Sequence, residues 1–154
     1  MRILRKGDTA PAFDGMTDGG NKIELRELKG KKVVLYFYPR DMTPGCTAEA
    51  EGFRDASKEF EKANTVILGV SKDSIKRHEN FKAKYDLPFM LISDEDGKIC
   101  SAYGVWQKKM NYGREYMGIV RSTFLIDEKG KIVEIWSNLR VKGHVEMVLD
   151  AARA

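Results

Sequence analysis

The feature that most constrains the fold is a run at residues 31–38, KKVVLYFY, which is uninterrupted and apolar from Val33 onward. Its β-branched and aromatic residues do not alternate with polar ones, which is the pattern of a strand covered on both faces. Gly30 precedes the run and Pro39 follows it, and a proline cannot donate to a sheet ladder. A strand of this kind needs cover on both sides, so the run predicts a layered α/β domain.

The rest of the chain alternates between strand and helix patterns. Turn residues at 18–21 (DGGN) lie between two short β-prone pieces and predict an N-terminal β-hairpin. Further strands are predicted at residues 65–70, 89–93, 118–126 and 131–136, with a hairpin turn at 127–130 (DEKG). Helices are predicted from Pro44 with an apolar stripe continuing to Phe60, from Asp73 or Ser74 to Tyr85, over 98–103, and from about Lys142 to the end. This order indicates a central mixed sheet flanked by helices.

Length and composition narrow the class of protein. The 154 residues suit one domain, residues 1–154, and a hydrophobic fraction of 42% is enough for a packed core. No apolar run approaches the roughly 20 residues that a membrane span needs. The net charge of +4 is spread along the chain, which argues against nucleic acid as a partner. The first residues lack the apolar core of a secretory signal, so we expect a cytoplasmic protein.

The two cysteines and two histidines are far apart. Cys46 and Cys100 are separated by 54 positions, which excludes a CxxC redox pair. His78 and His144 have no clustered partners at ligand spacing, so the sequence predicts no metal site and no catalytic histidine. No phosphate-binding loop or dinucleotide motif is present, and we expect no bound cofactor.

Cys46 stands directly after the buried strand and at the start of the predicted helix. Free backbone N–H groups and the positive end of the helix dipole meet there, and both stabilise a thiolate relative to a thiol. Because the thiolate is the nucleophile, this position favours a reactive cysteine over one that merely packs in the core.

The residues around Cys46 resemble the peroxiredoxin family. Pro39, Thr43 and Cys46 match the pattern PxxxTxxC, within the string FYPRDMTPGCT. Further matches are residues 7–13 (GDTAPAF), 69–73 (GVSKD), 91–94 (LISD), 103–106 (YGVW) and 121–127 (RSTFLID). Together they resemble the bacterioferritin comigratory protein or peroxiredoxin Q subfamily, and the similarity extends from about Gly7 to the C-terminus. The resemblance implies a thioredoxin-like fold and a thiol-dependent peroxidase, an antioxidant enzyme of cell redox homeostasis.

The resemblance implies roles for individual residues. Cys46 would attack hydrogen peroxide or an organic hydroperoxide and become a sulfenic acid. The Thr43 hydroxyl would accept a hydrogen bond from the peroxide and donate toward the thiolate. Arg121 would supply a permanent positive charge and several fixed donors.

Three further residues would surround that centre. Pro39 would shield the thiolate from water, although it could simply end the strand. Glu49 could orient an active-site arginine by a bidentate contact, or be an ordinary first-turn carboxylate. Tyr38 could line the pocket, as could Trp106, but aromatic residues beside a buried strand usually belong to the core.

One residue departs from the subfamily pattern. Many members have a resolving cysteine five positions after the peroxidatic one, and here that position is Glu51. The Cys46 sulfenic acid could therefore be reduced by an external thiol such as thioredoxin, glutaredoxin or glutathione, which is the route we favour. The alternative is an intramolecular disulfide with Cys100 after local unfolding.

Two other functions remain open at this stage. A disulfide reductase would need the paired cysteines that are missing here. A non-catalytic binding module on the same fold would have no reason to keep Pro39, Thr43, Cys46 and Arg121 together. The resemblance also suggests a monomer.

Overall fold

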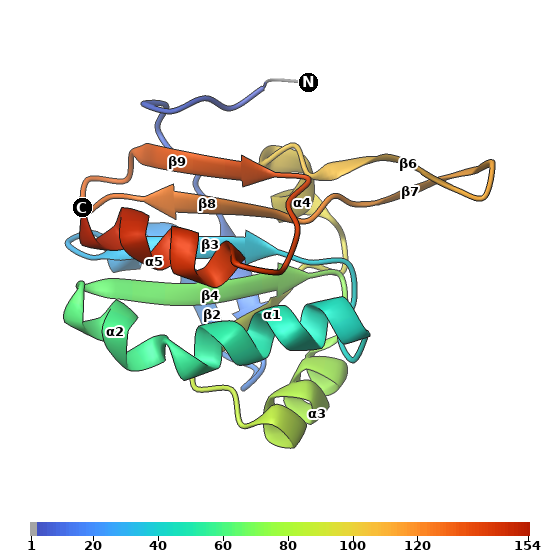
Figure 1. Cartoon of the computed structure of the whole chain (residues 1–154), viewed down its shortest axis with the longest axis horizontal. Helices are drawn as coiled ribbons and strands as arrows, with labels where there is room; N and C mark the ends of the chain where they lie inside the picture. Colours follow the sequence, from blue (N-terminus) through green and yellow to red (C-terminus); the bar gives the residue numbers. More distant parts are fainter. Residues whose placement is uncertain (1–2) are drawn as a thin grey trace.

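A computed structural model describes residues 3–154, which form one seven-stranded sheet with helices on both faces and a separate two-stranded ribbon (Figure 1). The strands are β1 (Asp14–Thr17), β2 (Lys22–Glu24), β3 (Lys32–Phe37), β4 (Thr65–Ser71), β5 (Met90–Ser93), β6 (Trp106–Asn111), β7 (Arg114–Ile119), β8 (Ser122–Ile126) and β9 (Ile132–Ser137). The helices are η1 (Leu25–Leu28), α1 (Pro44–Asp55), α2 (Ser57–Lys62), α3 (Ile75–Tyr85), α4 (Lys98–Ala102) and α5 (His144–Arg153).

The sheet is mixed, as the sequence predicts. Its strand order is β2-β1-β5-β4-β3-β8-β9. β3 pairs in parallel with β4 on one side and antiparallel with β8 on the other, so the strongly apolar run lies at the interior of the sheet. The N-terminal hairpin of β1 and β2 is present and extends the sheet beyond β5.

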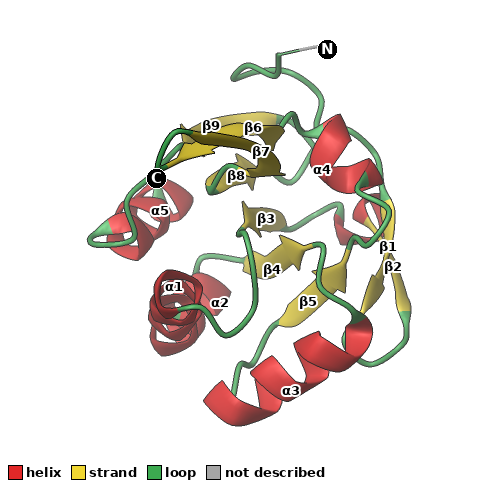
Figure 2. Ribbon diagram, turned by 90° about the vertical axis from the view of Figure 1, so that its right-hand side faces the viewer, coloured by secondary structure: helices red, strands yellow, loops and turns green. Residues whose placement is uncertain are grey.

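The side chains of β3 alternate between two cores. Val33, Leu35 and Phe37 pack on one face with residues of α4. Val34 and Tyr36 pack on the other face with residues of α1, α2, α3 and α5. Figure 2 shows α1, α2 and α5 on one side of the sheet and α4 on the opposite side. The two-sided cover explains why the sequence of β3 shows no polar alternation.

Two elements differ from the sequence prediction. The helix that begins at Pro44 ends at Asp55, and a new helix begins at Ser57, because Ala56 leaves the helical region (φ −95°, ψ 2°). The apolar stripe continues across this break to the buried Phe60, which is why the sequence predicts one helix.

The second difference is a hairpin that the sequence analysis missed. β6 and β7 pair only with each other and project from the body of the protein (Figure 1). The single strand predicted over 118–126 is therefore divided between β7 and β8, with Arg121 at the junction. Among the described residues, no helix is long and apolar enough to span a membrane.

Candidate active site

The carboxyl ends of β3 and β4 meet at one edge of the sheet, and the loop after β3 carries the chain into α1. Pro44 is the first residue of α1, where its missing N–H costs nothing. Cys46 is the third helical residue and is only 1% exposed. The thiol therefore lies in the first turn of α1, where the positive end of the helix dipole is located.

Arg121 directly precedes β8, whose first residue pairs with the last residue of β3, and its side chain contacts Cys46. Its Nη2 donates to the Cys46 Sγ over 3.3 Å. A Cβ on Gly45 would lie 3.2 Å from that same Nη2, so the absence of a side chain at residue 45 lets the guanidinium approach. Burial lowers the pKa of Arg121, but Glu49 and Cys46 outweigh it and raise the pKa above its ordinary value. The guanidinium is therefore charged beside the sulfur.

Glu49 holds Arg121 from the next turn of α1. Its Oε1 accepts from Arg121 Nη1 over 2.6 Å, whereas its Oε2 is buried without a hydrogen bond to the described residues. The contact is thus single, and the bidentate contact considered above does not form. Burial raises the pKa of Glu49 to about 7, although Arg121 opposes the rise. The carboxyl group is consequently balanced between its neutral and charged forms near neutral pH.

His144, the first residue of α5, lies behind Glu49. Its Nε2 is 2.9 Å from Thr123 Oγ1 and 3.9 Å from Glu49 Oε2. Burial and the positive charge of Arg121 lower the pKa of His144 to about 4, so its ring is neutral at physiological pH. The sequence analysis found no role for this histidine, because only the fold brings α5 to α1.

The remaining predicted residues occupy the loop before α1. Thr43 precedes the helix, and its hydroxyl donates to the Arg40 carbonyl over 2.8 Å. In this arrangement its hydrogen is used by Arg40, and the hydroxyl oxygen is the group that could accept a hydrogen bond from a peroxide. Pro39 is half-buried at the end of β3. Tyr38 is 1% exposed and donates to Asp41 Oδ1 over 2.6 Å, so it supports the loop from within the core.

Cys100 lies in α4, on the opposite face of the sheet from Cys46. It is 0% exposed, and its backbone N–H donates to Asp94 Oδ2 over 2.8 Å. Burial, together with the Asp94 carboxylate, raises the pKa of this thiol well above its ordinary value. The structure does not bring the two cysteines together, and Cys100 is held in its less nucleophilic form. Trp106 packs against the same core as Cys100. The Lys72 Nζ lies 4.1 Å from the centroid of the Trp106 ring.

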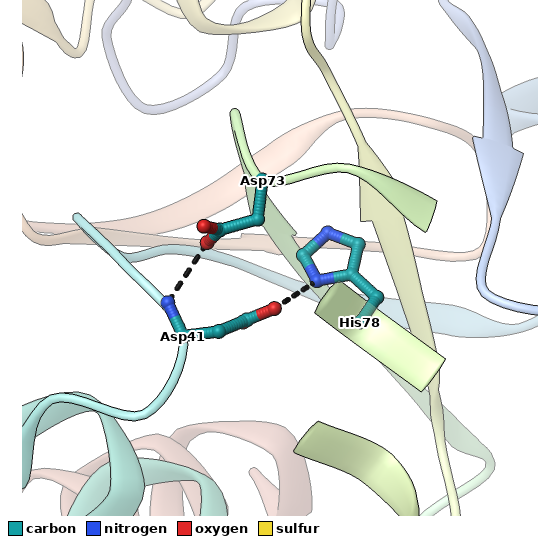
Figure 3. A group of neighbouring side chains, drawn as sticks. All are labelled: Asp41, Asp73 and His78. Carbon is teal, nitrogen blue, oxygen red and sulfur yellow. Dashed lines mark hydrogen bonds and ion pairs between the residues drawn. The ribbon is translucent and has the colours of Figure 1, made fainter. Parts of the chain in front are cut away.

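One group of side chains in residues 3–154 has the composition of a metal site. Potential ligand atoms of Asp41, Asp73 and His78 all lie within 4.8 Å of one another (Figure 3). Each of the three is engaged in hydrogen bonds: Asp41 and His78 bond each other, and Asp73 accepts from the Asp41 N–H. The group therefore links the loop before α1 to α3 through its own contacts.

Comparison with known proteins agrees with this geometry. Residues 6–135 match the model of the AhpC/TSA family. Similar curated proteins include one from Coxiella burnetii, 54% identical over 95% of this chain and 97% of its own length. The peroxiredoxin Bcp of Bacillus subtilis is 48% identical over 96% of this chain and 94% of its own.

Solved structures give the same result. The bacterioferritin comigratory protein of Xanthomonas campestris, described for its alkyl peroxide reduction activity, superposes with a TM-score of 0.88 at 43% identity, over 92% of this chain and 90% of its own. Peroxiredoxin Q of Xylella fastidiosa superposes with a TM-score of 0.92 at 39% identity, over 98% of this chain and 96% of its own.

Fold and site together define a class, the thioredoxin-like proteins that carry a single buried thiol at the start of a helix, in contact with an arginine. The chain belongs to the AhpC/TSA family, in its Bcp or peroxiredoxin Q group, and is a thiol-dependent peroxidase.

Proposed function

We propose that Cys46 is the peroxidatic residue and that it acts on hydrogen peroxide and on alkyl hydroperoxides. The Cys46 thiolate attacks one peroxide oxygen, the O–O bond breaks, and the second oxygen leaves as water or an alcohol after taking up a proton. The sulfur becomes a sulfenic acid. The observation that carries this proposal is the 3.3 Å contact between Arg121 Nη2 and the Cys46 Sγ at a helix start.

Arg121 and Thr43 complete the proposed site. The guanidinium favours the thiolate and stabilises the negative charge that moves onto the leaving oxygen. Thr43 accepts a hydrogen bond from the peroxide, which its geometry supports because its own hydrogen is already used by the Arg40 carbonyl. Glu49 positions Arg121 through the 2.6 Å contact, the half-buried Pro39 shields the thiolate from water, and Tyr38 supports the loop through Asp41.

We propose that an external thiol closes the cycle. A donor thiol attacks the sulfenic sulfur, water leaves, and a mixed disulfide forms, which a second thiol then reduces. Two observations support this route over a Cys46–Cys100 disulfide: the cysteines pack in cores on opposite faces of the sheet, and the pKa of Cys100 is raised by burial and by Asp94. Glu51, at the place where many relatives have a resolving cysteine, is an acid.

The donor, location and assembly follow from the same chemistry. Thioredoxin, glutaredoxin and glutathione are the candidate reductants, and all three suit a reducing compartment such as the cytoplasm, where unpaired cysteines persist. The resemblance to the peroxiredoxin Q group supports a monomer as the active unit.

Stopped-flow consumption of hydrogen peroxide by the reduced protein tests the proposal. We expect a fast phase in the wild type and in Cys100→Ser, and none in Cys46→Ser. Turnover with one of the three donors should survive in Cys100→Ser. Equal consumption by the wild type and Cys46→Ser would overturn the proposed role of Cys46. Loss of turnover in Cys100→Ser, with the fast phase intact, would favour the disulfide route.

A further inference from the structure

Asp41 is the most completely anchored residue of the active-site loop, which we define as residues 39–43. It is a carboxylic acid with 1% exposure, in a loop whose neighbouring Arg40 and Met42 are exposed. Figure 3 shows its side chain directed at His78 of α3 and its backbone facing Asp73. A buried carboxyl group needs hydrogen-bond partners, and here they are Tyr38, which follows β3, and His78 of α3.

The side chain of Asp41 uses both oxygens. Oδ1 accepts from the Tyr38 hydroxyl and Oδ2 contacts His78 Nδ1, each over 2.6 Å. Tyr38 follows β3 and His78 lies in the second turn of α3. The carboxyl group therefore connects the end of the central strand to a helix that begins more than thirty residues later.

The backbone of Asp41 is bound as well. Its N–H donates to Asp73 Oδ2 over 2.8 Å, and its carbonyl accepts from Arg77 Nη2 over 3.4 Å. Asp73 is in turn fixed by the Ser71 hydroxyl over 2.6 Å and by Arg77 Nε over 2.9 Å. Three polar groups of Asp41, namely its N–H, its carbonyl and Oδ2, thus attach the loop to α3 and to the segment before it.

The contact between Asp41 and His78 requires a hydrogen atom on one of the two side chains. His78 Nε2 lies 2.9 Å from the Ile92 carbonyl, which can only accept, so Nε2 carries a hydrogen. The 2.6 Å contact between Nδ1 and Oδ2 needs a second hydrogen, on either the nitrogen or the oxygen. In both arrangements the pair has no net charge, which is the condition under which two titratable groups can be buried together.

The anchor stands beside the strained part of the loop. Met42 has φ 69°, in the left-handed region that side-chain-bearing residues disfavour. Its side chain is 39% exposed and cannot hold the backbone in place by packing. The residues on either side do so: Asp41 through the contacts above, and Thr43 through its bond to the Arg40 carbonyl. Met42 lies between Asp41 and Thr43. Thr43 is the residue directly before α1, so its position sets where α1 starts and where Cys46 lies.

From these contacts we propose that Asp41 and His78 form a buried clamp between the active-site loop and α3, and act as positioning residues for the reaction at Cys46. This inference rests on the proposed function. The clamp keeps Thr43 and the first turn of α1 in the arrangement that attacks peroxide, and because Cys46 is only 1% exposed in this arrangement, the clamp also restricts the access of thiols to the oxidised sulfur.

The decisive comparison is Asp41→Asn against Asp41→Ala. The asparagine carbonyl can accept from Tyr38, and its amide can donate to an unprotonated Nδ1 while Nε2–H still donates to Ile92. Asparagine therefore preserves the clamp without the hydrogen that Asp41 and His78 share, whereas alanine removes the clamp. Two rate constants would be measured by stopped flow: that of the reduced enzyme with hydrogen peroxide, and that of the Cys46 sulfenic acid with thionitrobenzoate.

We expect opposite changes in the two rate constants. Asp41→Ala and His78→Phe should lower the peroxide rate constant at least tenfold and raise the thionitrobenzoate rate constant at least threefold. Asp41→Asn should stay within threefold of the wild type for both. Tyr38→Phe, which deletes one bond to Asp41 and is the variant least able to disturb folding, should change each rate constant in the same direction as alanine but by less.

A matched control separates positioning from general destabilisation. Phe60→Leu weakens the same core from α2, away from the active-site loop, and should leave both rate constants within threefold of the wild type. Asp41→Ala within threefold of the wild type would overturn the clamp, as would Asp41→Asn as slow as alanine, or Phe60→Leu with the same opposite changes. A wild type without a fast peroxide phase would instead overturn the proposed function.

Discussion

The two cysteines have the same exposure and opposite surroundings. Cys46 is 1% exposed and Cys100 is 0% exposed. Cys46 contacts the guanidinium of Arg121 at the start of a helix, whereas Cys100 lies beside the carboxylate of Asp94 among apolar side chains on the other face of the sheet. The two thiols therefore differ in the sign of the nearest charge and in their position relative to a helix start, and we propose that these differences make Cys46 the reactive one.

Removing the positive charge of Arg121 should have the largest effect on the reactivity of Cys46. We expect Arg121→Met to lower the rate constant with peroxide by about 10²–10³-fold, because it removes a donor that stabilises the developing charge. Stopped-flow measurement under pseudo-first-order conditions would show this. Arg140→Met, at an exposed position, is the control and should stay near the wild type. A rate constant for Arg121→Met within threefold of the wild type would show that Arg121 does not assist the reaction.

Glu49 should make stability depend on pH. Its pKa rises from 4.5 to about 7 on folding, so it contributes stability that is complete below about pH 4.5 and lost as pH rises through about 7. Relative to Glu49→Gln, the wild type should lose up to about 3 kcal/mol of unfolding free energy over this window. Urea denaturation at several pH values measures the difference. Glu51→Gln, two residues further along α1 and half-exposed, is the control variant for a carboxylate that is not buried.

His144 should produce the opposite trend at lower pH. Its pKa falls from 6.5 to about 4 on folding, so the stability is present above about pH 6.5 and lost as pH falls through about 4. Relative to His144→Gln, we expect the wild type to lose up to about 3 kcal/mol of unfolding free energy over that window. The same urea series, extended to acid pH, measures it. If the difference in unfolding free energy between the wild type and His144→Gln did not change with pH, burial and Arg121 would not be keeping the His144 ring neutral.

Replacing each cysteine by alanine should separate activity from stability. Cys100→Ala should keep the peroxide rate constant within twofold while lowering the free energy of unfolding by about 1–2 kcal/mol, because it leaves a small cavity in a packed core. Cys46→Ala should abolish the fast phase. Urea denaturation of the reduced proteins and stopped flow on the same samples would test both. A lower rate constant in Cys100→Ala would mean that the two faces of the sheet are coupled.

Much of the fold could be predicted because the main sheet is buried on both faces. The run at residues 31–38 and the alternation of later elements predict the mixed sheet and its helices. The β6–β7 hairpin could not be recognised by apolar alternation, since most of its side chains are exposed and its strands pair only with each other. The local sequence signal of this hairpin is the glycine of Tyr112-Gly113. Both residues have positive φ, as the central residues of a tight hairpin turn do.

The site was predictable only in part. Cys46 could be found from its position at a strand-to-helix junction, and the motif drew attention to Pro39 and Thr43. Arg121 is 75 residues from Cys46, and only the resemblance to a family linked them. Asp41–His78 and Glu49–His144 could not be paired from the sequence, because each contact depends on how α3 and α5 pack against the loop and α1.

Mass spectrometry of the protein after one equivalent of hydrogen peroxide would show whether Cys46, beside the positive charge of Arg121, is the cysteine that reacts. The account predicts a sulfenic acid on Cys46, trapped by dimedone or as a mixed disulfide with an added thiol, and an unmodified Cys100 in the same digest. A peptide pair joined by a Cys46–Cys100 disulfide, or oxidation of Cys100 in place of Cys46, would contradict it.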